Sequence, residues 1–354
     1  APYDALLTHG FAVDGAGRKM SKSRGNVIAP QKVMDTLGAD ILRLWVAATD
    51  YRGEMSVSDE IMKRTADAYR RIRNTARYLL ANLDGFVPER DSVTESEMVE
   101  LDRWVLGQTA QMQQEIIDAY ESCQFHLIYQ KLHQFCVVIL GNFYLDIIKD
   151  RIYTMPTTSL ARRSAQTAMY HIAEAFVRWI APILSFTADE IWQHLPGPRS
   201  ESVFLEEWYQ GNPVTSAPDS AKWQQVIAVR DEVSKVLERL RVAGEIGSGL
   251  DAEILIYSNE FYQRALTSIG DELRFVLICS SAVVSYASNN PDNADNADKT
   301  ELDGVWIRAI PSTHAKCIRC WHHRPDVGKN PSHTELCLRC VENVDGNGET
   351  RHFA

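Results

Sequence analysis

Lys19-Met20-Ser21-Lys22-Ser23 is the stretch from which the fold of this chain can be worked out. It carries two cations and two hydroxyl groups, and Gly25 follows it, where the backbone can approach an anion closely. Before it, residues 3–13 have the pattern of a strand and residues 14–17 that of a hairpin turn. This context predicts a mobile phosphate-binding loop, although two lysines in a surface loop often have no function.

Two cysteine pairs near the end of the chain predict a metal site. Cys317 and Cys320 form the first pair and Cys337 and Cys340 the second, with residues 321–336 between them. This spacing is typical of a zinc ribbon. Four thiolates suit tetrahedral Zn²⁺ and leave no open position, so we expect one structural zinc and no metal–water chemistry. Four free thiols, or a histidine of this segment replacing a cysteine, are the alternatives.

Composition limits the kinds of protein that this chain can be. Its 354 residues allow two or three domains with cores of their own. A net charge of −10 argues against indiscriminate nucleic-acid binding, so any RNA contact requires a local basic surface. The first residues lack the pattern of a signal peptide, and the apolar stretch 176–186 is too short to span a bilayer. We therefore expect no membrane partner.

Residues 58–83 predict a long amphipathic helix. Apolar side chains recur at three- and four-residue steps and form one face: Met62, Ala66, Tyr69, Ile72, Ala76, Leu79 and Leu83. A second face carries Lys63, Arg70 and Arg77, flanked by Arg64 and Arg71. This basic face is either a solvated surface or an RNA-facing stripe, because arginines bind phosphate groups in a bidentate manner.

Helical patterns continue through most of the remaining chain. Three further long helices are predicted at residues 98–121, 123–150 and 159–195, and their short connections favour an antiparallel bundle. Residues 210–220 have the composition of a linker. A helix over 221–243 then precedes a small α/β unit, with strands at 252–257, 282–287 and 305–310 and a helix at 260–269.

These motifs resemble a known family. Residues 19–26 match the KMSKS signature of class I aminoacyl-tRNA synthetases residue for residue, and residues 38–45 follow at the distance that this family shows. The run 69–83 and the module Cys317-Ile318-Arg319-Cys320-Trp321-His322 are similar to the isoleucyl branch of bacterial type. The resemblance covers essentially the whole chain.

The resemblance implies a multidomain, mainly α-helical fold in four parts. Residues 1–57 would end a class I, Rossmann-type catalytic domain, and 58–209 would form an anticodon-binding antiparallel helical bundle. Residues 210–312 would contain the linker, a helix and the small α/β domain, and 313–354 the zinc-binding module. The family's His-Ile-Gly-His motif and its editing insertion do not occur here. We therefore expect the C-terminal part of a longer enzyme, which would be inactive alone.

The resemblance also implies a reaction and its site residues. The carboxylate of isoleucine attacks the α-phosphorus of ATP, with Mg²⁺, and the adenylate then passes its aminoacyl group to tRNA(Ile). Lys22 is the expected catalytic cation and Lys19 its partner. The expected ATP-binding residues are Lys19, Met20, Ser21, Lys22, Ser23, Gly25 and Asn26. The expected tRNA-binding residues are Lys63, Arg70, Arg71, Arg77, Arg319 and Arg339.

Several other interpretations stay open. The chain could be a non-catalytic tRNA-binding module, or a relative of the valyl, leucyl or methionyl enzymes. Valyl enzymes usually end in a coiled coil, so the cysteine module favours the isoleucyl branch. A purely structural zinc-ribbon protein would leave the hairpin, loop and helix around Lys22 unexplained. The family resemblance and the reducing compartment indicated by the cysteines imply a cytoplasmic protein, and the family is expected to act as a monomer.

Overall fold

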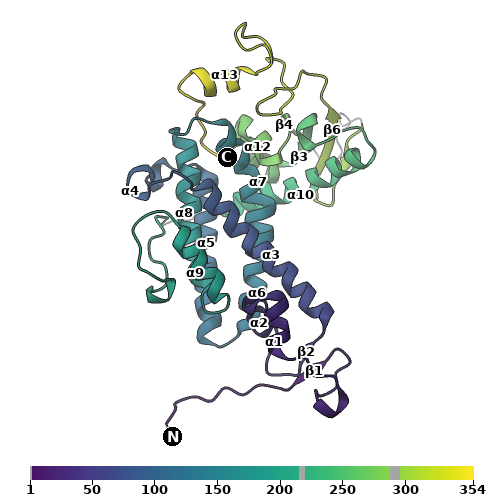
Figure 1. Ribbon diagram of the computed structural model, residues 1–354. Helices are drawn as coiled ribbons and strands as arrows, with labels where there is room; N and C mark the ends of the chain where they lie inside the picture. Colours follow the sequence, from purple (N-terminus) through teal and green to yellow (C-terminus); the bar gives the residue numbers. More distant parts are fainter. Residues whose placement is uncertain (1, 215–219, 288–295) are drawn as a thin grey trace. The chain divides into compact units, whose positions relative to one another are not determined.

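The computed structural model describes residues 2–214, 220–287 and 296–354 (Figure 1). It divides into two compact units. Unit 1 contains Ala1–Asp91, Gln108–Phe143 and Met169–Asn212, and unit 2 contains Ser92–Gly107, Tyr144–Ala168 and Pro213–Ala354. Residues 215–219 of the predicted linker lie outside the described residues.

The start of unit 1 contains a small parallel sheet. Strand β1 (Ala12–Asp14) pairs with β2 (Met55–Val57). The strand predicted over 3–13 is therefore wrong in extent, because its partner strand has only three residues and cannot satisfy a longer backbone. The predicted turn is present, since Val13 forms an isolated antiparallel bridge with Lys19.

Two helices, α1 (Pro30–Leu37) and α2 (Ala39–Ala48), follow this sheet. Pro30 occupies the first position of α1, because its fixed φ suits a helix start and its missing N–H is not needed there. Gly38 separates the helices with a φ of 91°, which favours glycine. Trp45 is buried, and its indole Nε1 donates a hydrogen bond to the carbonyl of Ser56 at 3.1 Å.

Helix α3 (Asp59–Asn82) confirms the amphipathic helix predicted over 58–83. Ser58 caps its start by accepting a hydrogen bond from the N–H of Ile61. The predicted apolar face is buried, except that Tyr69 is half-buried and its hydroxyl lies 2.9 Å from Oγ1 of Thr187.

The remaining long helices differ from the predictions in two places. They are α5 (Glu100–Glu121), α6 (Phe125–Gln134), a π-helical stretch (Phe135–Tyr144), α7 (Leu145–Thr154), α8 (Leu160–Ile180) and α9 (Ser185–His194), with a short α4 (Pro88–Asp91) before them. The single helix predicted over 159–195 is wrong, because α8 ends before Pro182, which cannot continue a helix. The helix predicted over 123–150 extends instead from 125 to 154.

The stretch from Phe125 to Thr154 is long and apolar enough to cross a membrane by length and composition. This stretch, rather than residues 176–186, is therefore the one whose length should be compared with the thickness of a bilayer. Half of its most apolar window is buried inside the protein. This burial is the property of a core helix, which passes the same test of length and hydropathy.

Asp40 joins α2 to α9 within unit 1. The carboxylate of Asp40 accepts hydrogen bonds from the N–H of Thr187 at 2.7 Å and from the hydroxyl of Thr187 at 2.6 Å. These donors lie in the first turn of α9, where backbone N–H groups have no partner within the helix. Arg43, one turn further along α2, donates to the carbonyls of Pro182 and Ile183, both at 2.7 Å.

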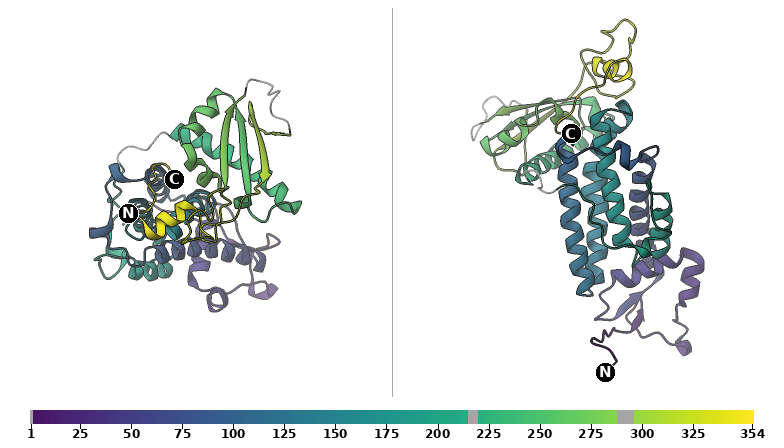
Figure 2. Two further views of the ribbon diagram at one scale, coloured as in Figure 1. Left: turned by 90° about the horizontal axis from the view of Figure 1, so that it is seen from above. Right: turned by 90° about the vertical axis from the view of Figure 1, so that its left-hand side faces the viewer.

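Unit 2 contains a four-stranded sheet in the order β4-β3-β6-β5 (Figure 2). The strands are β3 (Ala252–Ser258), β4 (Ser281–Tyr286), β5 (Asp298–Lys299) and β6 (Val305–Pro311). Strand β3 pairs parallel with β4 and antiparallel with β6. Helices α10 (Ser220–Val242), α11 (Glu260–Thr267) and α12 (Leu273–Leu277) pack against this sheet. The predicted small α/β unit is therefore present, with β5 and α12 as additions.

A buried ion pair joins three helices of unit 2. Arg151 on α7 donates two hydrogen bonds to Asp102 on α5, both at 2.8 Å. Asp102 also accepts from the hydroxyls of Tyr144 and of Ser164 on α8. Both charged side chains are at most 1% exposed. Because each carboxylate oxygen has a donor, the cost of removing these charges from water is offset by the pairing.

We predict that Asp40→Ala lowers the free energy of unfolding by about 1–3 kcal/mol, because two donors at the start of α9 lose their buried acceptor. Asp40→Asn keeps one oxygen acceptor and should cost less. Urea unfolding, followed by circular dichroism, measures both. Asp35→Ala removes an exposed carboxylate from the neighbouring helix α1 and serves as the control. Equal stability of the Asp40→Ala and Asp35→Ala variants would contradict the capping role.

Candidate nucleotide loop and zinc centre

The loop that carries Lys19 and Lys22 leaves β1 and reaches α1 through a single 3₁₀ turn, Lys22–Arg24. Gly25 ends this turn in the left-handed conformation, with a φ of 69°. A Cβ at this position would meet no atom within 4 Å. Glycine therefore suits this position because of its left-handed backbone conformation. No other part of the protein comes so close to Gly25 that a side chain would be excluded.

The side chains of the loop divide into an inward and an outward group. Met20 packs against the hydrophobic cluster that contains Val33 and Trp45. Lys19 is exposed, and its Nζ lies 4.2 Å above the ring centre of Phe11, which is a cation–π contact. Lys22 is also exposed, and among the described residues no acidic side chain pairs with either lysine. Both cations are thus available to an anionic ligand.

Hydrogen bonds fix the base of the loop. The hydroxyls of Ser21 and Ser23 lie 2.7 Å apart. Asn26 accepts a hydrogen bond from the N–H of Ser21 at 2.9 Å and donates one to Asp14 at 3.0 Å. Hydrogen bonds from Asn26 and Arg18 hold the pKa of Asp14 well below its ordinary value. Asp14 therefore remains a carboxylate at neutral pH, which suits it as an acceptor at this point.

The four predicted metal ligands come together in unit 2. The Sγ atoms of Cys317, Cys320, Cys337 and Cys340 all lie within 4.8 Å of one another, and all four residues are buried. Tetrahedral zinc with Zn–S bonds of about 2.3 Å requires sulfur atoms about 3.8 Å apart. The Sγ atoms of Cys320 and Cys337 are 3.7 Å apart, which fits this geometry. All four ligand atoms in this group are sulfur, which is the ligand set of a structural zinc site.

Local structure explains how two short segments form this cluster. The first pair sits in a tight turn, in which the N–H of Trp321 bonds the carbonyl of Cys317 and the N–H of Cys317 bonds the carbonyl of His322, both at 2.9 Å. The second pair opens α13 (Leu338–Asp345), so that Cys340 follows Cys337 by about one helical turn.

The three histidines of this segment are used elsewhere. His322 is buried, and its ring packs against Phe275 at 5.5 Å in an edge-on arrangement. His323 lies 3.2 Å from a carboxylate oxygen of Asp251, and His333 lies 2.6 Å from one of Asp345. The cysteine set is therefore sufficient, as the sequence predicted. Cys136 and Cys279 are separate buried thiols, and burial raises the pKa of each to about 12.

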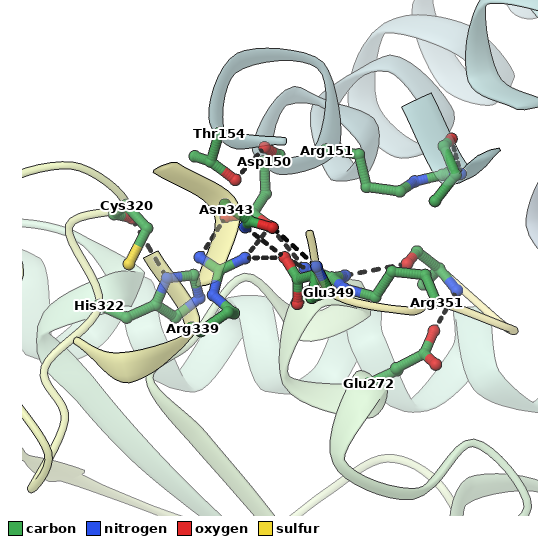
Figure 3. Close-up of polar contacts among 12 residues, drawn as sticks. Asp150, Arg151, Thr154, Glu272, Cys320, His322, Arg339, Asn343, Glu349 and Arg351 are labelled. Carbon is green, nitrogen blue, oxygen red and sulfur yellow. Dashed lines mark hydrogen bonds and ion pairs between the residues drawn. The ribbon is translucent and has the colours of Figure 1, made fainter. Parts of the chain in front are cut away.

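An ion network attaches the C-terminal segment to α7 within unit 2 (Figure 3). Arg339 donates to both oxygens of Asp150, at 2.7 and 2.9 Å, and to Glu349 at 2.7 Å. Arg351 donates to Asp150 at 2.7 Å and to Glu349 at 3.0 Å. Burial alone would raise the pKa of Asp150, but the charges of Arg339 and Arg351 outweigh it and hold the pKa well below its ordinary value.

The last residues of the chain are fixed in the same unit. The carboxylate of Glu272 accepts hydrogen bonds from the N–H groups of His352, Phe353 and Ala354, at 2.8–2.9 Å. The guanidinium of Arg351 lies 3.2 Å from the ring centre of Phe275. The sequence did not predict this network, because Asp150 and Glu272 are far from their partners in the chain and no local pattern connects them.

The structure separates the six predicted tRNA-binding residues into three groups. Lys63, Arg71 and Arg77 are exposed on α3, and among the described residues none of them has an acidic partner. Arg70 is exposed too but pairs with Asp67 at 2.6 Å. Arg319 is exposed and donates a hydrogen bond to the carbonyl of Thr154 at 3.1 Å.

The third group is Arg339 alone. Its guanidinium donates hydrogen bonds to Asp150 and Glu349. Its side chain is 12% exposed, and these acids hold its pKa well above the ordinary value despite burial. Its charge is thus already neutralised inside unit 2. We therefore leave Arg339 out of the proposed RNA contacts.

Trp321 is a surface feature that the sequence analysis did not select. It is 61% exposed and has a φ of 66°, which is rare for a residue with a bulky side chain. It borders a mainly apolar hollow of 440 Å³, together with Tyr153 and Arg319. A tryptophan directly after the second cysteine of a metal turn, in a segment with few apolar residues, was the signal that could have identified it.

Three family models match parts of this chain. Residues 1–58 match the family described as class I tRNA synthetases (I, L, M and V), and residues 102–256 match the anticodon-binding domain of tRNA ligase. Residues 316–343, which contain all four cysteines, match the zinc finger found in FPG and IleRS. The first match contains Lys19 and Lys22, and the third contains the cysteine cluster.

Similar full-length sequences share one description. The isoleucine–tRNA ligase of Methylococcus capsulatus is 61% identical over 356 residues, and that of Nitrosococcus oceani is 61% identical over 357. The isoleucine–tRNA ligase of Haemophilus influenzae is 59% identical over 360 residues. Over its whole length, the chain is similar to these isoleucine–tRNA ligases. Each alignment covers 100% of this chain and 38% of the relative, so the chain spans less than half the length of the ligases that it matches.

The zinc finger match and the buried cysteine cluster establish a structural zinc centre. Cys317, Cys320, Cys337 and Cys340 would hold the ion as thiolates. The ion would crosslink two segments that have few apolar side chains between them. Zinc-finger peptides gain about 10–16 kcal/mol from such binding, so the metal rather than a hydrophobic core stabilises this part of the chain.

We predict that the purified chain contains one zinc ion and that Cys340→Ser lowers this content, because three thiolates hold zinc less tightly than four. Atomic absorption measures the metal, and limited trypsin digestion near Arg319 and Lys329 reports loss of local structure. Cys123→Ser changes a half-buried thiol outside the cluster and should leave both readouts unchanged. Full zinc content in Cys340→Ser would contradict the four-cysteine site.

Proposed function

We propose that this chain is the C-terminal part of an enzyme that attaches isoleucine to tRNA(Ile) in two steps, through an isoleucyl adenylate. The observation that carries the proposal is the 57–61% identity to isoleucine–tRNA ligases along the whole chain. We also propose that the complete enzyme acts as a cytoplasmic monomer. Isoleucine selection would lie in the remaining length of the enzyme.

We propose that Lys22, with Lys19, stabilises the transition state of ATP activation. In that step, negative charge accumulates on the phosphate oxygens and on the leaving pyrophosphate, which is bound to Mg²⁺. A cation that meets this charge mainly in the transition state accelerates the reaction. The exposed, unpaired state of both lysines among the described residues supports this role. The fixed base of the loop supports it further, because a positioned charge needs less reorganisation than a mobile one.

We further propose two RNA-binding surfaces, one in each unit. The first is the basic face of α3, with Lys63, Arg71 and Arg77, and Arg70 at its edge. The second surrounds the hollow bordered by Arg319 and Trp321. Arginine binds phosphate groups, and an exposed tryptophan can stack on an unpaired base. The overall charge of −10 supports confinement of RNA binding to such local surfaces.

For the complete enzyme, we propose the division into 1–57, 58–209, 210–312 and 313–354 that the sequence suggested. The matches to residues 1–58 and 316–343 support the first and last of these parts. The first part would complete the ATP site, and the others would hold the tRNA. The competing function is a tRNA-binding module without catalysis, and the next two experiments separate it from the ligase.

We predict that Lys22→Ala in the complete ligase lowers the rate of ATP–pyrophosphate exchange by about 10²–10³, the usual effect of removing one charged contact to a transition state. Its affinity for tRNA should stay unchanged, because the loop cation acts on ATP. Lys32→Ala removes an exposed lysine from α1 and is the matched control. Normal exchange in Lys22→Ala would refute the catalytic assignment.

We predict that Arg71→Ala/Arg77→Ala weakens tRNA binding by the 354-residue chain. Each lost phosphate contact should reduce the slope of log K against log salt concentration by about 0.7–0.9. Filter binding at several salt concentrations measures both quantities. Arg241→Ala, on α10, removes an exposed arginine that is paired with Glu238 and should have little effect. An unchanged slope in the double variant would remove α3 from the proposed interface.

A further inference from the structure

The side chain of Asn26 is engaged inside the loop rather than directed to a ligand. Its Oδ1 accepts a hydrogen bond from the N–H of Ser21 at 2.9 Å. Its Nδ2 donates to Oδ2 of Asp14 at 3.0 Å and to the carbonyl of Lys19 at 3.4 Å. Both N–H groups of the amide and its oxygen therefore have partners within the protein. The sequence analysis had counted Asn26 among the ATP-binding residues.

Asp14 holds the other end of this arrangement. It lies at the end of β1, is 8% exposed, and accepts at Oδ1 from the N–H groups of Ala16 and Arg18, at 3.0 and 2.9 Å. At Oδ2 it accepts from Nε of Arg18 and from Asn26, both at 3.0 Å. The carboxylate thus fixes the turn that enters the loop, and Asn26 connects it to the segment that leaves the loop.

We propose that Asn26 is a positioning residue, which together with Asp14 clips the two ends of the loop and sets the positions of Lys19 and Lys22. This inference rests on the proposed function, in which these lysines meet the phosphates of ATP. Asn26 touches neither lysine side chain in this arrangement; it acts through the backbone that carries them.

The arrangement of the loop backbone explains why a clip has this effect. Asn26 bonds the carbonyl of Lys19 and the N–H of Ser21, which are the two residues beside Met20. The side chain of Met20 is held in the hydrophobic cluster. The segment 19–21 is therefore fixed by polar contacts on one side and by packing on the other. Lys22 follows directly, so its backbone has little freedom even though its side chain is exposed.

The chemistry of the clip accepts an amide at position 26 and excludes a carboxylate. Position 26 must donate to Asp14 and accept from Ser21. In Asn26→Asp, two carboxylates would face each other, and the donor to Lys19 would be lost. In Asp14→Asn/Asn26→Asp, the amide and the carboxylate exchange places. The amide at 14 can donate across the clip and still accept from Ala16 and Arg18, and the carboxylate at 26 still accepts from Ser21.

The test measures ATP–pyrophosphate exchange by the complete ligase, with kcat and KM for ATP determined separately. We expect Asn26→Asp to lower kcat by about 10–100-fold with KM nearly unchanged, because a displacement of about 1 Å can cost 10²-fold. We expect the exchanged pair to recover most of this loss. Arg18→Ala reports the cost of the two guanidinium contacts, from Nε at 3.0 Å and from Nη2 at 2.9 Å, that the exchanged pair also gives up. Asn347→Asp makes the same chemical change at an exposed site in unit 2 and should behave as wild type.

Rescue by the exchanged pair distinguishes positioning from direct binding, because a direct contact between Asn26 and ATP would not be restored by it. An unchanged kcat in Asn26→Asp overturns the proposal. A raised KM for ATP without rescue overturns it too, since it indicates a direct contact. Lys22→Ala, measured in parallel, separates the two levels: if it lowers exchange while Asn26→Asp does not, the clip is wrong and the proposed function stands.

Discussion

A buried carboxylate that lacks hydrogen-bond donors destabilises a protein by several kcal/mol, and this constraint governs how the described segments are joined. Asp40 in unit 1 meets the first turn of α9. In unit 2, Asp102 meets Arg151, and Asp150 meets Arg339 and Arg351. Each acid joins segments that are separated by tens to hundreds of residues in the chain. Each therefore selects one arrangement of its segments, because other arrangements would leave the charge without a partner.

The C-terminal segment shows why such pairing accompanies the zinc centre. A segment of this size has too few apolar side chains to form a core, and the four cysteines replace that core with a metal crosslink. The crosslink fixes the segment internally but gives it no attachment to the rest of unit 2. Asp150 supplies that attachment by holding Arg339 and Arg351, and Phe275 packs beneath the latter. Glu349 pairs with both arginines within the segment. Metal and ion network are therefore complementary constraints on the same residues.

The sequence predicted features whose cause is local. The helical period of residues 58–83, the spacing of the cysteine pairs and the alternation in β3 each follow from side chains near one another in the chain. Features with a distant cause were missed or wrong. The length of β1 depends on β2, Thr187 lies 147 residues from Asp40, and Asp150 lies 189 residues from Arg339. The break in the helix predicted over 159–195 is different, because its cause, Pro182, is local.

The loop combines both kinds of cause. Its cations and glycine could be identified from the sequence, because their types alone suit an anion. The role of Asn26 could not be identified from the sequence. It depends on the three-dimensional path of the loop, which brings Asn26 back to Asp14. The same residue type would serve equally well as a ligand or as a clip, and the hydrogen bonds to Ser21 and Asp14 favour the second. An exposed loop that must present charge therefore requires fixed hydrogen bonds at its base, since mobile cations would lose part of their effect to reorganisation.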